Sequence, residues 1–177
     1  MSTIYVRKAT EADLDDIYTI IKNAKKFLGE QGIDQWQSDY PSEDDLARDV
    51  KFGISYVLDV DGQVAGTATL HLGIDPDYLH LEGGEWANGD QGHYSAIHRI
   101  AVSNDYRGQG LASKFISGLF TISSLRGFKD VRIDTHPDNK GMQHVILSNG
   151  FTKRGTIYAN GKRNHGTERF AYQIELK

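Results

Sequence analysis

The sequence predicts an α/β protein in which a mixed, mostly antiparallel sheet of seven strands is flanked by four helices. Segments with the period-two alternation of strands and segments with helical spacing of apolar residues follow one another along the chain. The dipeptide Asp61-Gly62 joins two strand-like segments, which indicates a hairpin and antiparallel pairing. A strand, a glycine-bearing turn and a helix occupy residues 97–122, and a helical crossover of this kind joins parallel neighbours.

The N-terminal half is predicted to hold three strands and two helices. Thr10 and Asp13 form a capping arrangement at the start of a helix that stops near residues 29–32. Ser42 and Asp45 mark the start of a second, shorter helix in the same way. The predicted strands cover residues 4–7, 55–60 and 63–72.

The C-terminal half is predicted to hold four strands and two helices. Arg126 and Gly127 end the long helix that begins after the glycine-bearing turn, through a cation and a C′ glycine. Asn139 can cap a further helix, which ends at Asn149-Gly150. The predicted strands cover residues 97–102, 131–135, 151–158 and 168–176, and an exposed turn covers residues 159–167.

Two loops allow two interpretations each. The loop over residues 32–41 contains Trp36 and Tyr40, which either pack as a lid or line a pocket. The acidic, glycine-bearing stretch over residues 73–92 is either an ordinary solvated loop or a functional one, because connections of this length are usually functional or mobile.

Length and charge set the class of protein. The 177 residues suit one domain, residues 1–177, with a sizeable core. The net charge of −4 creates no field that attracts nucleic acid. The N-terminus lacks a leader pattern, and no apolar run approaches membrane-spanning length. We therefore expect a cytoplasmic protein with no nucleic acid and no membrane as partner, and a homodimer remains open.

The content of cysteine and histidine restricts the chemistry. The absence of cysteine excludes disulfides, thiolate metal sites and a cysteine nucleophile. The seven histidines do not fall in a His-x-x-x-His or similar spacing, so no metal site is expected.

The turn between residues 103 and 110 is suited to an anion. Gly108 and Gly110 stand where the helix begins, so backbone N–H groups can face a ligand without interfering side chains. The helix dipole and Arg107 add positive charge, which favours a phosphate or pyrophosphate. The spacing matches neither the P-loop nor the dinucleotide-binding fingerprint. By spacing alone, a plain tight turn remains an alternative.

Arg107, Gly110 and Ala112 fit the Q/R-x-x-G-x-G/A loop of the GNAT superfamily of acyl-CoA-dependent N-acyltransferases. The segment IAVSNDYRGQG resembles that family's junction of the fourth strand and third helix, and the resemblance covers nearly all of the chain. It implies the GNAT fold and an N-acetyltransferase that moves an acetyl group from acetyl-CoA directly to a primary amine of a small molecule or peptide. The implied cofactor-binding residues are Ile100, Ala101, Val102, Arg107, Gly108, Gln109, Gly110, Leu111, Ala112, Ser113 and Asn139.

The resemblance also implies a general base, because the acceptor amine must lose a proton before it attacks. His98 stands at the place of a base histidine in serotonin N-acetyltransferases. It shares strand parity with Ile100 and Val102, so we expect it to face the cofactor cleft, although a hydrogen-bonded sheet histidine is the alternative. His136 is the second candidate for the base. The carboxylates that could relay the proton are Glu82 and Glu85.

One departure from the family concerns the general acid. Many GNAT enzymes place a tyrosine in the fourth helix to protonate the departing thiolate, and the alignment puts Ile146 at that position. The departure supports an alternative function, a CoA-binding sensor or regulatory module without turnover.

Overall fold

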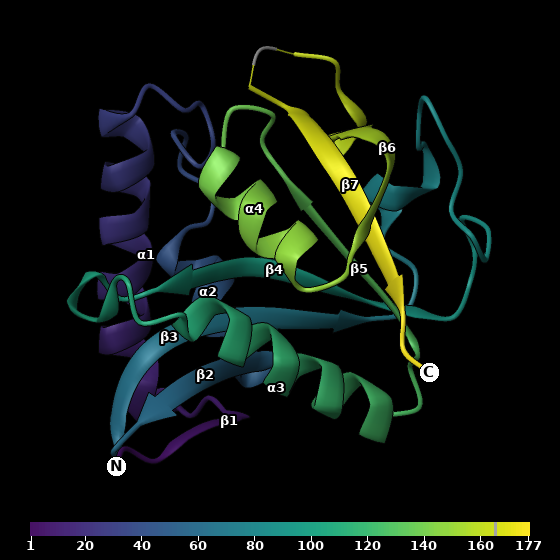
Figure 1. Ribbon diagram of the computed structural model, residues 1–177. Helices are drawn as coiled ribbons and strands as arrows, with labels where there is room; N and C mark the ends of the chain where they lie inside the picture. Colours follow the sequence, from purple (N-terminus) through teal and green to yellow (C-terminus); the bar gives the residue numbers. More distant parts are fainter. Residues whose placement is uncertain (165) are drawn as a thin grey trace.

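The computed structural model describes residues 1–164 and 166–177, and in this part of the chain it confirms the predicted fold of seven strands and four helices (Figure 1). The strands are β1 (Ile4–Lys8), β2 (Ser55–Val60), β3 (Gln63–Leu72), β4 (Tyr94–Val102), β5 (Asp130–Thr135), β6 (Thr152–Tyr158) and β7 (Glu168–Glu175). The helices are α1 (Leu14–Glu30), α2 (Glu43–Lys51), α3 (Leu111–Leu125) and α4 (Lys140–Ser148).

The strands form one sheet in the order β1-β2-β3-β4-β5-β7-β6. Neighbouring strands run antiparallel, with the exception of β4 and β5, which run parallel. The crossover between these two strands contains α3, because a parallel connection has to return along the sheet. The mixed directions therefore follow from the hairpins and from this crossover.

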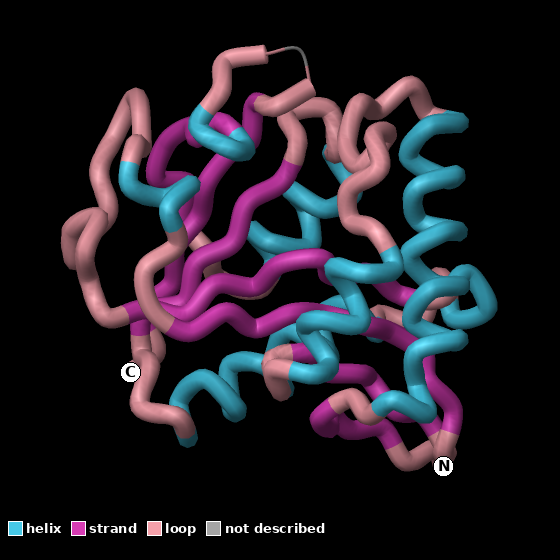
Figure 2. The backbone as a smooth tube through the Cα atoms, turned by 180° about the vertical axis from the view of Figure 1, so that it is seen from behind, coloured by secondary structure: helices cyan, strands magenta, loops and turns pink. Residues whose placement is uncertain are grey.

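The helices lie in two layers. Helices α3 and α4 cover one face of the sheet, and α1 and α2 cover the other face (Figures 1 and 2). Phe115 and Leu119 of α3 are fully buried against the first face, whereas Ile17 of α1 is fully buried against the second. Successive side chains of β2 point to opposite faces of the sheet and therefore pack against both layers: Val57 faces α1, and Leu58 faces α3.

Local signals in the sequence account for the helix ends. The capping box of Thr10 and Asp13 forms in a short turn, η1 (Glu11–Asp13), immediately before α1. Ser42 and Asp45 form the second capping box at α2. Gly127 follows α3 with a φ of 87°, in the left-handed region typical of a C′ glycine.

Loss of the Ser42 cap is expected to destabilise the protein measurably. Ser42→Ala removes the hydroxyl that accepts from the backbone N–H of Asp45 at 3.1 Å, which leaves that donor without its cap. We expect a loss of about 1 kcal/mol in the free energy of unfolding, measured by urea denaturation. Ser148→Ala, at the exposed end of α4, is the control and is expected to change little. Equal stability of the two variants would contradict the capping role.

Two strands begin earlier than predicted. β4 starts at Tyr94 rather than at residue 97, and β5 starts at Asp130 rather than at residue 131. A prediction based on apolar runs does not include the polar Ser95 in the strand. In the structure, Ser95 is fully buried, and its hydroxyl forms a hydrogen bond with the hydroxyl of Ser123 at 2.7 Å. In the predicted turn 159–167, a short turn η4 (Ala159–Gly161) forms, and residue 165 lies outside the described residues.

The stretch between β3 and β4 is fixed to the sheet, so it is no simple solvated loop. Fully buried Arg132 of β5 lies between the rings of Trp86 and Tyr94, with its guanidinium carbon 4.2 Å and 3.7 Å from the two ring centroids. It also donates to the carbonyl of Gly89 at 2.8 Å and to Asp130 at 2.9 Å. This anchor holds the preceding turn η2 (Pro76–Leu79) over the sheet.

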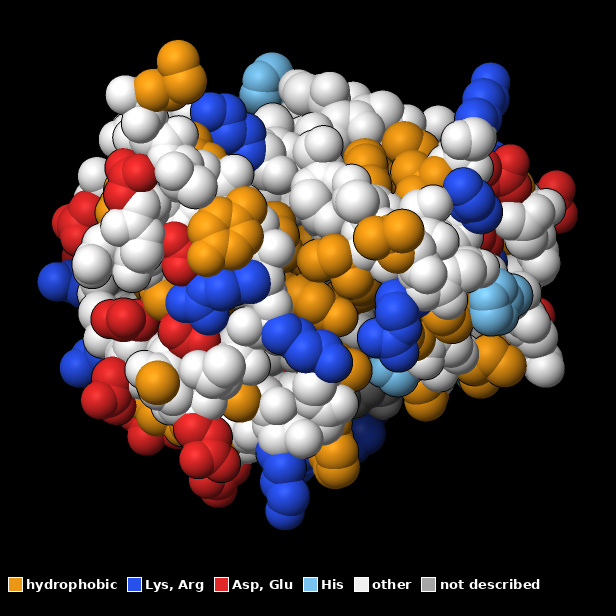
Figure 3. Space-filling model, turned by 90° about the horizontal axis from the view of Figure 1, so that it is seen from below, with side chains coloured by type: hydrophobic (Ala, Val, Ile, Leu, Met, Phe, Trp, Pro, Cys, Tyr) orange, Lys and Arg blue, Asp and Glu red, His pale blue; other side chains and the backbone are white. Residues whose placement is uncertain are grey.

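The exposed surface is mixed in character. On the face seen from below, Lys and Arg side chains stand singly between apolar and acidic ones (Figure 3). None of the helices in the described part of the chain has the length and apolar character needed to cross a bilayer.

Candidate active site

The site begins where β4 and β5 part. Their pairing ends at Ile97 and Ile133, although β4 continues to Val102 and β5 to Thr135 (Figure 1). Within the described chain, β4 therefore has no strand partner on its β5 side beyond Ile97, and backbone N–H and C=O groups there are open to a ligand. A cleft of about 1080 Å³ lies at this split.

One end of the cleft has the features that a cofactor with a pyrophosphate would need. Of the residues that the sequence predicts to bind the cofactor, Ile100, Ala101, Val102, Arg107 and Gly108 line it. Across from them, the cleft is lined by apolar side chains of α1 and α4, namely Ala24, Phe27, Leu28, Met142 and Val145.

Of the predicted loop residues beyond the cleft lining, Gln109 and Gly110 precede α3, and Leu111, Ala112 and Ser113 form its first turn. Gly108 and Gly110 have φ angles of 76° and 67°, and a Cβ at either position would meet open space. Their backbone is accordingly accessible and adopts a conformation that favours glycine. Beyond Gly110, Leu111 is buried in the core, Ala112 follows it, and the Ser113 hydroxyl accepts from Asn149 at 3.1 Å.

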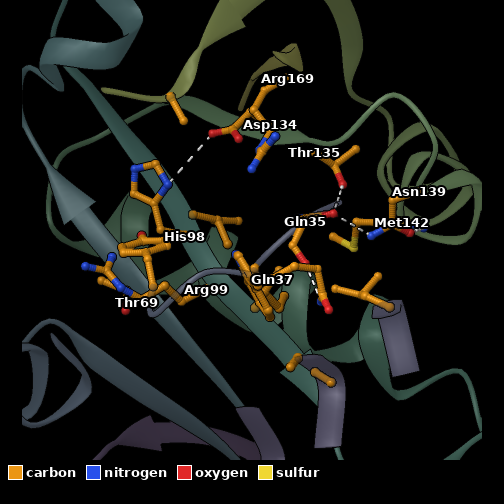
Figure 4. A pocket seen from close by; sticks show the side chains of 18 of the residues that line it. Gln35, Gln37, Thr69, His98, Arg99, Asp134, Thr135, Asn139, Met142 and Arg169 are labelled. Atoms are coloured by element: carbon orange, nitrogen blue, oxygen red, sulfur yellow. Dashed lines mark hydrogen bonds and ion pairs between the residues drawn. The ribbon is translucent and has the colours of Figure 1, made fainter. Parts of the chain in front are cut away.

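Asn139 caps α4, as predicted, and it also lines the cleft, where its contact with a cofactor stays a prediction. Its Oδ1 accepts from the backbone N–H of Met142 at 3.0 Å, and its Nδ2 donates to Oε1 of Gln35 at 2.9 Å. Gln35 is buried in the loop between α1 and α2, and its Oε1 also lies 3.4 Å from the hydroxyl of Thr135 (Figure 4). The contacts of Gln35 with Asn139 and Thr135 hold the α1–α2 loop over the split between β4 and β5. Trp36 and Tyr40 of this loop line the cleft.

The parity argument for His98 is wrong, because β4 contains a bulge. Thr69 pairs with His98 and Thr67 pairs with Ala101, so one residue of β3 stands opposite two of β4. Arg99, in the bulge, has a φ of 50°. Ile100 consequently packs on the α3 face, whereas the ring of His98 lies on the opposite face, 5.8 Å from the ring of Tyr78. His98 nevertheless lines the same cleft as Ile100.

His98 stands between two carboxylates that come from different parts of the chain. Its Nε2 lies 2.6 Å from Oδ2 of Asp75, and its Nδ1 lies 3.9 Å from Oδ2 of Asp134 (Figure 4). Asp134 also accepts the hydroxyl hydrogen of buried Tyr78 at 2.7 Å. Both carboxylates line the cleft. The arrangement can orient an imidazole ring and hold a proton close to it.

Opposing effects set the pKa values of this pair. Burial by itself lowers the pKa of His98, but the hydrogen bond to Asp75 and the charges of Asp134 and Asp75 outweigh it, and the pKa lies above its ordinary value. For Asp75, burial raises the pKa, but the hydrogen bond and charge of His98 leave the pKa below its ordinary value. The folded protein therefore stabilises a protonated histidine beside an ionised aspartate.

The other candidates for proton transfer lie elsewhere. His136 is buried outside the cleft lining, where its Nδ1 accepts from the backbone N–H of Asp138 at 3.1 Å. Glu82 pairs with Arg163, and Glu85 is exposed, so the carboxylates beside His98 are those of Asp75 and Asp134. In α4, Ile146 is fully buried in the core, while Gly141, Met142 and Val145 line the cleft. The helix thus presents non-titratable side chains to the cleft.

Several charged residues that line the cleft carry no recognisable signal in the sequence. The acidic character of residues 73–92 pointed towards Asp75 without singling it out, and the pattern around Asp134 is that of an ordinary strand. Arg99 and Arg169 also line the cleft, and neither stands in a recognisable motif. Among the described residues, no cluster of side chains suited to holding a metal ion was found.

Comparison with known proteins agrees with the fold. Residues 14–151 match the model of the acetyltransferase (GNAT) family, and the chain therefore belongs to that family. A GNAT acetyltransferase of Streptococcus agalactiae is 33% identical, with a TM-score of 0.85 over 98% of this chain and 95% of that one. By class, the protein is an acyltransferase.

Two further relatives are more distant. The uncharacterized N-acetyltransferase YesJ of Bacillus subtilis (strain 168) is 24% identical over 155 residues, which cover 85% of this chain and 83% of that protein. The structure of yncA from Salmonella typhimurium, with its cofactor acetyl-CoA, is 19% identical and has a TM-score of 0.67 over 98% of this chain and 94% of that one.

Proposed function

We propose that the protein transfers an acetyl group from acetyl-CoA directly to a primary amine of a small molecule or peptide. The observation that carries the proposal is one continuous cleft, which joins the open edge of β4 and the glycine loop to His98. The yncA structure, which contains acetyl-CoA, supports the choice of donor.

The residues present fit the donor. Accessible backbone at Gly108 and Gly110, at the start of α3, provides N–H groups for a pyrophosphate, and Arg107 adds a cation at the same end. The unpaired edge over Ile100, Ala101 and Val102 provides hydrogen bonds for an extended amide-containing arm. When bound, acetyl-CoA supplies a thioester as the activated acyl group.

His98 is the base in this proposal. Because Nε2 lies against the ionised Asp75, the neutral ring carries its hydrogen on Nε2 and keeps its lone pair on Nδ1. Nδ1 faces the side of the split where Asp134 lies. An ammonium group placed between Nδ1 and Asp134 would be attracted by the carboxylate and would pass its proton to Nδ1. The neutral amine then has the lone pair needed to attack the acyl carbon.

The absence of cysteine supports direct transfer. The chain has no cysteine that could hold an acyl intermediate as a thioester, so donor and acceptor would occupy the cleft together. A panel of amines tests the activity: free thiol and acetylated amine should appear in equal amounts, and only when the amine is present. Tight CoA binding without acetylation of any amine would favour a sensor or regulatory module instead.

The pH dependence of the reaction tests the role of Asp75. Because the folded protein raises the pKa of His98, the base is protonated and inactive below that raised value. The acid limb of the kcat/KM profile should therefore lie above pH ~6.5 in the unaltered protein. Asp75→Asn removes the charge that holds the proton, so the limb should move to lower pH. Asp90→Asn, an exposed residue of the same loop, is the control. Unchanged midpoints in Asp75→Asn would contradict the assignment.

A further inference from the structure

Arg169 is a cation in the cleft with unused hydrogen-bond donors. It lies in β7, next to Phe170, which pairs with the last residue of β5. Its Nη1 donates to the carbonyls of Gly166 and Glu168, both at 2.7 Å. Among the described residues, Nε and Nη2 have no hydrogen-bond partner, and no carboxylate oxygen lies within 4.0 Å of the guanidinium. The side chain reaches into the pocket on the side of Asp134 (Figure 4).

The partly buried charge of Arg169 is unfavourable for folding unless a bound ligand supplies an opposite charge. Burial is the main cause of a pKa of Arg169 below its ordinary value, and the charges of Asp134, Asp34, Tyr40 and Asp77 only partly oppose it. A half-buried charge without a close partner is unfavourable, whereas the planar guanidinium binds a carboxylate through two parallel hydrogen bonds. The two hydrogen bonds from Nη1 to backbone carbonyls fix the guanidinium, so that Nε and Nη2 can face such a ligand.

Arg99, another arginine that lines the cleft, has a carboxylate of the protein close by, although its buried Nε makes no hydrogen bond within the described part of the chain. Its Nε lies 3.4 Å from Oδ2 of Asp49, and its guanidinium carbon lies 5.3 Å from the ring centroid of Tyr40. Asp49 is itself fixed by the hydroxyl of Thr69 at 2.6 Å. Of these two arginines, Arg169 is therefore the one without a carboxylate partner in the described part of the chain.

We propose that the acceptor is a small amino acid whose carboxylate binds the Nε and Nη2 fork of Arg169 while its amine lies between His98 and Asp134. The inference rests on the proposed function and names the substrate class for that site. Asp134 lies between His98 and Arg169 in the pocket, so a molecule with an amine and a carboxylate a few bonds apart meets complementary charges at both ends (Figure 4). A polyamine would place a second cation against Arg169.

Matched acceptors that differ in one group test the proposal. The kcat/KM for acetylation is measured with a panel of amino acids, their C-terminal amides and diamines of similar length. The unaltered protein should prefer the free acids. Arg169→Gln should lower kcat/KM for the acids by roughly 30-fold or more and should leave the amides almost unchanged, so that the preference disappears. Arg126→Gln, an exposed arginine after α3, is the control and should retain the preference.

Two outcomes overturn the inference and leave acetyl transfer intact: equal or better turnover of amides or diamines by the unaltered protein, or equal losses for acids and amides in Arg169→Gln. If no amine is acetylated, the proposed function fails, and the carboxylate site is judged by binding alone. Calorimetry of the CoA-loaded protein should then still show tighter binding of the acids than of the amides, with the difference lost in Arg169→Gln. Equal binding of acid and amide would overturn the site.

Discussion

Replacement of His98 by alanine is expected to lower kcat/KM for acetylation by about 10²–10⁴-fold near neutral pH. The variant retains the open edge of β4 and the glycine loop but loses the lone pair that would receive the proton of the amine. The loss should be largest at low pH, where few amine molecules are already neutral, and should shrink as the pH rises. Initial rates measured across a range of pH provide the test.

His144→Ala is the matched control for this loss. His144 lies on the exposed side of α4, away from the residues that line the cleft. Its replacement should leave kcat/KM almost unchanged. If His98→Ala keeps both the height and the shape of the unaltered pH profile, His98 is a structural residue of the sheet and the base lies elsewhere.

Introduction of a carboxylate at Gly110 is expected to abolish tight binding of CoA. Gly110→Glu places a side chain with negative charge at the start of α3, where the pyrophosphate would meet the backbone N–H groups. The residue also has a φ of 67°, so the replacement strains the turn that aligns these donors. Together, repulsion and loss of donors should weaken binding by several kcal/mol, measured by calorimetry.

Gly127→Glu separates this effect from backbone strain. Gly127 follows the other end of the same helix, with a φ of 87° and open space at its Cβ position. Both variants should lose a similar part of their free energy of unfolding, but Gly127→Glu should bind CoA as the unaltered protein does. Unchanged affinity in a folded Gly110→Glu variant would overturn the assignment of the loop.

The elements of the fold could be predicted because their signals are local. The Ser42 and Asp45 capping box, the Asp61-Gly62 hairpin and the glycines near the start of α3 each act on backbone groups within a few residues. These signals are readable without knowledge of the packing. The sequence did not predict the start of β4, because its first residues are buried by contacts with residues that are distant in sequence. The hydrogen bond between Ser95 and Ser123 is one such contact.

The position of His98 shows what local reasoning cannot predict. Parity along β4 predicts that His98 and Ile100 share a face, but the bulge at Arg99 adds one residue and reverses the relation. A bulge is settled by the register between two strands, which no residue in the bulge determines alone. The same limit applies to Ile146, whose alignment with a family position does not reveal that its side chain is buried in the core.

The sequence by itself determined the order of the elements, the family and the glycine loop, because these depend on residues that are close together along the chain. Only the tertiary structure decided which side chains surround the reacting groups. Asp75 and Asp134 reach His98 from either side in sequence, and Arg169 joins them from β7. Contacts of this kind depend on strand order and on the split between β4 and β5, and these arise only when the whole sheet has formed.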